Sequence, residues 1–210
     1  MTTARKLIAL FLTLSLLLTS VCALSEGGSW TVNTSVKSLM NDKQARQALK
    51  KATKTNVGYD LTPLALLGTQ VVSGTNYCIL CYGSTVTREP ANSLCKAYVY
   101  EDLEGKAKLT KVREIKLKGA PSSGWKISRN KKALAVDKAA RSALKKAVAS
   151  LDGADYTPLL TLGKAKDAYS LLCRRRLTDR SGTTDLCIVA LRKKGGKYTV
   201  RRIDELAVAE

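Results

Sequence analysis

The cysteines are the residues of this chain whose type and spacing could do chemistry. Cys78 and Cys81 form a CxxC pair, and Cys81 lies 14 residues before Cys95, as Cys173 does before Cys187. A CxxC pair is typical of a redox centre or a zinc site. Redox pairs, however, lie at helix N-termini, whereas Cys78 and Cys81 fall within an apolar run that predicts a strand, on opposite faces of a sheet. We therefore favour a structural role for these cysteines.

Histidine is absent from the 210 residues, and this excludes several classes of function. No Ser–His–Asp or Cys–His catalytic centre and no imidazole metal site can form. Zinc would need further ligands, and the chain has no second CxxC pair. No nucleophile can be matched with a general base, so we expect no enzyme, no metal and no cofactor. Apolar residues make up 45% of the chain, which is enough for a packed core.

The first 23 residues have the pattern of a secretory signal peptide. Arg5 and Lys6 precede the apolar run Leu7–Leu18, and Ala23 is a small residue at the cleavage position. The run is too short for a membrane span. We expect a secreted protein that does not span the membrane and is cleaved after Ala23. A lipoprotein anchored through Cys22 is less favoured, because the valine before it is larger than lipoprotein processing prefers.

The rest of the chain is a tandem repeat with an offset of 95 residues. Residues 42–68 match residues 137–163 without a gap and are identical at 16 of 27 positions. Trp30 aligns with Trp125 at the same offset, and a linker-like segment of Gly, Ala, Pro and Ser lies at 119–124. We therefore expect two domains, residues 24–118 and 119–210.

Each repeat predicts one helix followed by antiparallel strands. Alanines and a leucine recur at helical spacing after Asp42 and after Asp137, which are candidate N-caps, and Gly58 and Gly153 follow as stop signals. Runs rich in β-forming residues come next, separated by turn residues. In the first repeat they are Leu64–Val72, Asn76–Tyr82, Leu94–Tyr100 and Lys108–Leu117. This order predicts an α+β fold in which each domain packs a helix on an antiparallel sheet.

The cysteines follow the repeat once its offset changes to 92 residues beyond position 68. Cys81 and Cys95 then correspond to Cys173 and Cys187, and each pair lies in two consecutive predicted strands. In a secreted chain we expect one cross-strand disulfide per domain, Cys81–Cys95 and Cys173–Cys187. Cys78 lies outside this pairing, because a serine stands at its position in the second repeat.

A QxVxG segment marks the place where the two repeats differ. It consists of Gln70, Val71, Val72, Ser73 and Gly74, and the second repeat is three residues shorter there. At this point the sequence resembles the cystatins, most closely the stefin branch, through residues 69–77 and through the order of helix, strands and hairpins over residues 27–118. Gly27 and Gly28 stand in the place of the cystatin N-terminal glycine. Residues 101–105 occupy the second hairpin, where this chain keeps an apolar residue, Leu103, in an otherwise acidic segment.

The resemblance implies a cystatin-like fold in both domains and inhibition of papain-like cysteine proteases by the first. The N-terminal segment Gly27–Gly28, the first hairpin Gln70–Gly74 and Leu103 would together form an apolar wedge that fills the protease cleft. The second domain lacks the motif, so we expect it to be structural or to hold a polyanion. The alternative is that Val71 and Val72 are ordinary strand residues and the protein is a non-inhibitory binding module.

The basic charge suggests a second kind of partner. The chain has 36 Lys and Arg against 17 Asp and Glu, a formal net charge of +19, or +17 without the first 23 residues. These residues either form solvated helix and strand faces or attach the protein to an anionic cell-surface polymer. Aromatic residues make up only 5% of the chain and no stacking motif lies near the basic runs, so we expect no sequence-specific nucleic-acid partner.

Overall fold

The computed structural model describes residues 28–54, 59–89 and 91–209, which form two α+β units. The first unit contains β1 (Thr31–Val32), α2 (Val36–Met40), α3 (Lys43–Ala52), β2 (Tyr59–Val72), β3 (Gly74–Thr85), β4 (Asn92–Glu101) and β5 (Ala107–Ile115). The second contains β6 (Lys126–Ile127), the 3₁₀ turn η1 (Lys131–Leu134), α4 (Lys138–Val148), β7 (Ala154–Ala165), β8 (Ala168–Leu177), β9 (Thr184–Lys194) and β10 (Lys197–Glu205). The predicted signal peptide, with Cys22, and the stop signal Gly58 lie outside the described residues.

Each unit has one five-stranded antiparallel sheet with its strands in chain order. The sheets run β1-β2-β3-β4-β5 and β6-β7-β8-β9-β10. The α+β prediction is confirmed, and the four strand runs expected in the first repeat lie largely within β2 to β5. The strand pairing follows the repeat as well. Thr31 lies opposite Thr69 in the first sheet, and the residues 95 positions later, Lys126 and Lys164, lie opposite each other in the second. The short helix α2 and the turn η1 were not expected from the sequence.

The alanine stripes of α3 and α4 pack on the sheets as their spacing predicts. In α3 the buried residues are Ala45, Ala48 and Leu49, and in α4 the matching positions are buried. Asp137 caps α4, since its carboxylate accepts a hydrogen bond of 2.7 Å from the amide of Ala140. For α3, the prediction that the side chain of Asp42 caps the helix is wrong. Asp42 occupies the N-cap position, but its carboxylate makes no capping hydrogen bond.

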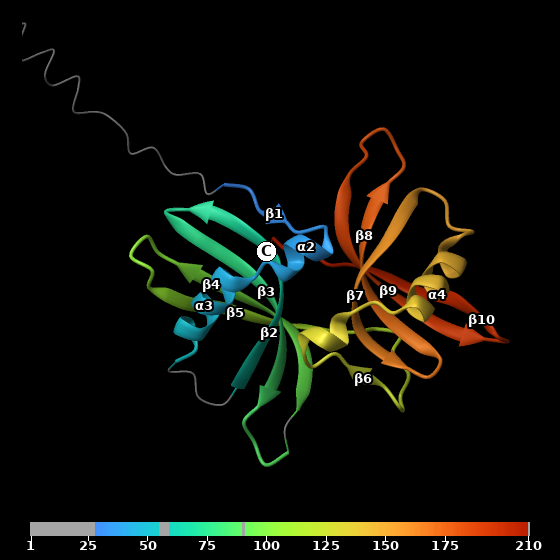
Figure 1. Cartoon of the computed structure of the whole chain (residues 1–210), viewed down its shortest axis with the longest axis horizontal. Coiled ribbons are helices and arrows are strands. Elements are labelled where there is room, and N and C mark those ends of the chain that lie inside the picture. Colours follow the sequence, from blue (N-terminus) through green and yellow to red (C-terminus); the bar gives the residue numbers. More distant parts are fainter. Residues whose placement is uncertain (1–27, 55–58, 90, 210) are drawn as a thin grey trace, which may run out of the picture.

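Each of the two sheets is apolar on both of its faces. The face toward the helix forms a core with α3 in the first unit and with α4 in the second. The opposite faces pack against each other in a shared core that includes Leu64 and Leu80 of the first unit and Leu160 and Leu172 of the second. Figure 1 shows α3 with the strands of the first unit and α4 with the strands of the second. The molecule is therefore built as helix, sheet, sheet, helix, and the two units are joined by a buried interface as well as by the chain.

The C-terminal segment after β10 crosses from the second unit to the first (Figure 1). Leu206 and Val208 are buried in the shared core. The ammonium of Lys96 donates a hydrogen bond of 2.7 Å to the carbonyl of Ala207. Gly68 gives Val208 room, because a Cβ at that position would lie 2.8 Å from the Val208 Cγ1 atom. This segment adds a second connection between the units.

Candidate functional site

The first hairpin of the first unit contains the QxVxG segment. Ser73 is the single residue between β2 and β3, and Val71 is 70% exposed at the tip. The side-chain oxygen of Gln70 accepts a hydrogen bond of 2.8 Å from the side-chain nitrogen Nδ2 of Asn76, across the hairpin. Gly74 has φ +130° and no space for a side chain, since a Cβ there would lie 2.4 Å from a backbone oxygen of β4. Gln70 therefore orients its own hairpin, and glycine is required at position 74.

The N-terminal segment lies beside this hairpin. The amide of Gly28 donates a hydrogen bond of 3.0 Å to the carbonyl of Val71. A Cβ at Gly28 would lie 2.9 Å from the same oxygen, so this close approach also favours glycine. Gly27 lies outside the described residues.

The second hairpin, residues 101–107, lies on the other side of the first. The hydroxyl of Tyr100 donates a hydrogen bond of 2.6 Å to the carbonyl of Ser73, which ties the two hairpins together. The carboxylate of Asp102 accepts hydrogen bonds from the backbone amides of Glu104 and Lys106, at 3.0 and 2.8 Å, and so fixes the shape of the turn. Leu103, at its tip, is 85% exposed. We call Gly28, Gln70–Gly74 and Glu101–Gly105 together the hairpin edge.

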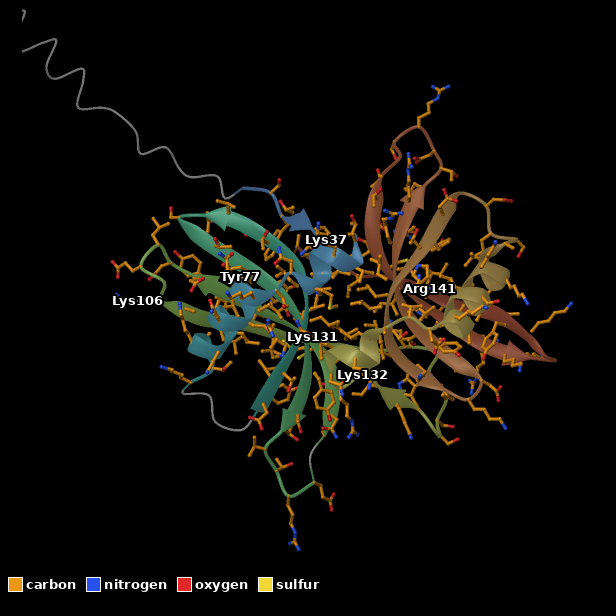
Figure 2. The ribbon with its side chains drawn as sticks, viewed as in Figure 1. Lys37, Tyr77, Lys106, Lys131, Lys132 and Arg141 are labelled. Carbon is orange, nitrogen blue, oxygen red and sulfur yellow. The ribbon has the colours of Figure 1, made fainter. Side chains whose placement is uncertain are left out.

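The acidic charge of the second hairpin is largely paired. Lys51, in the last turn of α3, donates to Glu101 at 2.7 Å and to the carbonyl of Gly105 at 2.8 Å. Lys106 pairs with Glu104 at 2.6 Å; Figure 2 shows Lys106 at the far end of the first unit. Burial, followed by the negative charge of Glu101, raises the pKa of Tyr77, whose hydroxyl donates to that carboxylate at 3.3 Å. Leu103 is thus presented on a hairpin whose carboxylates have local partners.

Sequence reasoning missed the residues that hold the hairpin edge together, Lys51 and Tyr100. Tyr100 lies one residue before the second turn, and Lys51 lies in the basic last turn of α3. An aromatic hydroxyl next to a predicted turn was the available signal for Tyr100. No local pattern indicates Lys51, because its partners are 50 and 54 residues away.

The second unit presents a different surface at the matching hairpins. Its first hairpin exposes Lys166 and Asp167, and its second turn is formed by Gly195 and Gly196. The amide of Lys193 donates a hydrogen bond of 2.8 Å to the carbonyl of Asp167. Among the described residues of this unit, the one exposed large apolar side chain is Leu151, at 38%, which follows α4 and is not at a hairpin. The two units therefore share an architecture but not an exposed apolar edge.

The predicted disulfides are not formed in this structure, although their register is as expected. Cys81 lies opposite Cys95, and Cys173 lies opposite Cys187, each pair buried on the helix-facing side of its sheet. All four are thiols. The Cys95 thiol lies 3.8 Å from the carbonyl oxygen of Cys81, and the Cys173 thiol lies 3.8 Å from the carbonyl oxygen of Leu171. Cys78 is buried on the opposite face, in the core shared by the units.

In the part of the chain that the structure describes, no cluster of three or more acidic or cysteine side chains is placed to hold a metal ion. In the same residues, no helix combines the length and hydropathy needed to cross a membrane.

Comparisons with known proteins give little guidance for this chain. No protein-family model matches the sequence, and no curated protein matches it. Among solved structures, an "Ntf2 like protein involved in plasmid conjugation" aligns over 70% of this chain and 78% of its own, with 6% identity and a TM-score of 0.27. A likeness this weak carries no argument about fold or function.

Proposed function

We propose that the protein is an inhibitor of papain-like cysteine proteases and that both units are cystatin-like. The observation that carries this proposal is the convergence of Gly28, the first hairpin and the second hairpin at one end of a sheet. The two most exposed large apolar side chains among the described residues, Val71 and Leu103, lie at this edge. The order of one main helix and a five-stranded antiparallel sheet also agrees with the cystatin resemblance of the sequence.

The hairpin edge has the physical properties that a blocking wedge needs. Burial of an aliphatic side chain of this size contributes about 1.5–3 kcal/mol, so Val71 and Leu103 can supply several kcal/mol on entering an apolar cleft. The hydrogen bonds from Gly28 and Tyr100 hold the segments before a partner arrives. Such preorganisation lowers the entropy cost of binding. Binding alone occludes the protease cleft, so the wedge needs no catalytic group of its own.

The proposal is tested by titrating papain with the full chain and with variants of the exposed residues. Val71→Asp and Leu103→Asp each place a charge where an apolar contact is expected, and each should weaken inhibition about 100-fold. Because both side chains are largely exposed, the variants should fold normally. Val86→Asp is the matched control, since Val86 is 60% exposed and follows the opposite end of β3. The proposal fails if the unmodified chain does not inhibit, or if all three variants inhibit equally.

A second candidate function is attachment to an anionic surface polymer. The outward sides of both main helices are basic: Lys43, Arg46 and Lys50 are exposed on α3, and Lys138, Arg141 and Lys145 on α4. Neither helix contains an acidic residue. Charge of one sign on the outer layers favours polyanions. Retention of the chain on an immobilised sulfated polysaccharide, lost between about 0.15 and 1 M salt, tests this candidate.

A further inference from the structure

We propose that a cleft beside Trp125 is a binding site for an acidic polysaccharide. The cleft has a volume of about 790 Å³, and the indole of Trp125 lines it together with Lys126, Arg129, Lys132 and Lys164. Asp137 is the one acidic residue in its lining. The proposal rests on the second candidate function and is independent of the hairpin edge, because none of these residues belongs to that edge.

The two strands beside this cleft bring like charges together. Lys126 of β6 lies directly opposite Lys164 of β7, and like charges at such positions are destabilising. The matching residues of the first unit, Thr31 and Thr69, are an uncharged pair in the same register. Asp137 relieves Lys164 only in part, since the two charged groups are 3.7 Å apart and about half exposed. An anion in the cleft would compensate both lysines.

The other cationic groups of the cleft lie on and around η1. Figure 2 shows Lys131 and Lys132 at η1, where the two sheets meet. Lys131 points to the buried carboxylate of Asp42, whereas Lys132 is exposed and lines the cleft. Arg129 is also exposed, with its guanidinium 5.8 Å from the Tyr82 ring centre. Three cations thus lie beside the half-buried indole: Lys126, Arg129 and Lys132. None of them forms an ion pair with another residue that the structure describes.

The shape of the cleft favours a chain-like ligand that carries both rings and charge. A second depression of about 280 Å³ adjoins the first and shares Trp125, Ile127 and Asn92 with it. Gly163 seats the indole, because a Cβ there would lie 2.4 Å from the ring. A flat indole beside cations suits a sugar ring that bears sulfate or carboxylate groups. Single-stranded nucleic acid is bound through several aromatic rings that stack successive bases, and here one aromatic residue lines the two depressions.

The test measures binding of a heparin decasaccharide to the full chain by calorimetry at physiological salt. The site variant is Lys126→Thr with Lys164→Thr, which installs the neutral pair of the first unit and removes the like-charge contact, so its thermal stability should be unchanged or higher. The matched control is Lys194→Thr with Lys197→Thr, which neutralises another pair of exposed lysines that lie directly opposite each other, on β9 and β10 away from the cleft. We expect binding about tenfold weaker in the site variant and nearly unchanged in the control.

Fluorescence gives an independent readout, because Trp30 and Trp125 are the two tryptophans of the chain. In a Trp30→Phe background, heparin should shift the Trp125 emission, and the site variant should abolish the shift. If heparin binds but both double variants weaken it equally, the cleft assignment is wrong while the second candidate function stands. If heparin does not bind, both are wrong. If a single-stranded oligonucleotide of equal charge binds as tightly and moves the emission equally, the polysaccharide assignment is overturned.

Discussion

Lys131 of the second unit forms an ion pair with Asp42 of the first, with its ammonium 2.7 and 2.6 Å from the two carboxylate oxygens. Asp42 is 1% exposed, and Arg46 is its other charged partner, at 3.2 Å. A buried carboxylate is costly unless it is paired. The residue that the sequence suggests as a helix cap is therefore one of the contacts that hold the two units together.

Removal of the Lys131 ammonium should destabilise the whole molecule. Lys131→Met leaves the Asp42 carboxylate buried with Arg46 alone, and loss of one partner of a buried pair costs about 3 kcal/mol. Urea unfolding at pH 7 measures this change. Lys132→Met is the control, because Lys132 is exposed, and it should change the free energy of unfolding by less than about 0.5 kcal/mol. Equal effects of the two variants would show that the ion pair does not join the units.

Cleavage of the connection between the units should not separate them. Ser122, Ser123 and Gly124 are exposed and accept a protease site, but the shared core and the C-terminal segment remain. We expect a chain cut between Ser122 and Ser123 to elute from a sizing column as one species under native conditions and as two fragments in denaturant. Two folded pieces under native conditions would show that the units are independent domains, as the linker-like composition alone suggests.

The parts of the fold that depend on local pattern could be predicted from the sequence. The alanine stripes placed the main helices, and the turn residues separated the strands. The packing of one sheet on the other depends on contacts between residues far apart in the chain, and it was not predicted. A signal for it existed: Leu64–Leu67 and Leu159–Leu162 are nearly continuous apolar runs, which indicate strands buried on both faces rather than one.

The candidate site was likewise predictable only in the parts that depend on local sequence. The motif at residues 70–74 identified the first hairpin, and Gly28 was placed beside it by the resemblance. The pairing of the acidic second hairpin depends on Lys51, which only the fold brings near Glu101. Local sequence therefore shows which side chains the edge exposes, while the tertiary structure shows how their backbone is held.

Lys51 should act as a positioning residue for Leu103. Its ammonium holds both ends of the second hairpin through Glu101 and Gly105. Lys51→Met should weaken papain inhibition about tenfold, since the hairpin must then be ordered on binding. It should cost less than about 1 kcal/mol of stability, because the Lys51 side chain is about half exposed. Lys50→Met, the adjacent exposed lysine, should leave inhibition unchanged; a loss of inhibition in both variants would point to general charge instead.

Oxidation should join the cysteines that lie opposite each other. Refolding with a glutathione redox pair should give Cys81–Cys95 and Cys173–Cys187, because the members of each pair share a face and a register position. In the chain-entropy model, each bridge should raise the free energy of unfolding by roughly 3 kcal/mol, because it closes a loop in the unfolded chain. Peptide mapping without reduction identifies the bonds. A bond from Cys78 to any of these four would contradict the register, since Cys78 faces the shared core.

The reduced protein should lose stability in alkaline solution through the same thiols. Burial, the largest cause, raises the pKa of Cys95 to about 11 and that of Cys187 to about 12, from an ordinary value of 9.0. Between pH 9 and 11 these thiols ionise in the unfolded chain but stay protonated in the folded one, so the free energy of unfolding falls as pH rises. The loss should reach roughly 2 kcal/mol per thiol at pH 11. Urea unfolding from pH 8 to 11 measures the slope, and Cys187→Ala should make it shallower. The oxidised protein, whose bridged sulfurs do not titrate, should lack this component, and an equal slope in all three forms would show that the thiols are not its source.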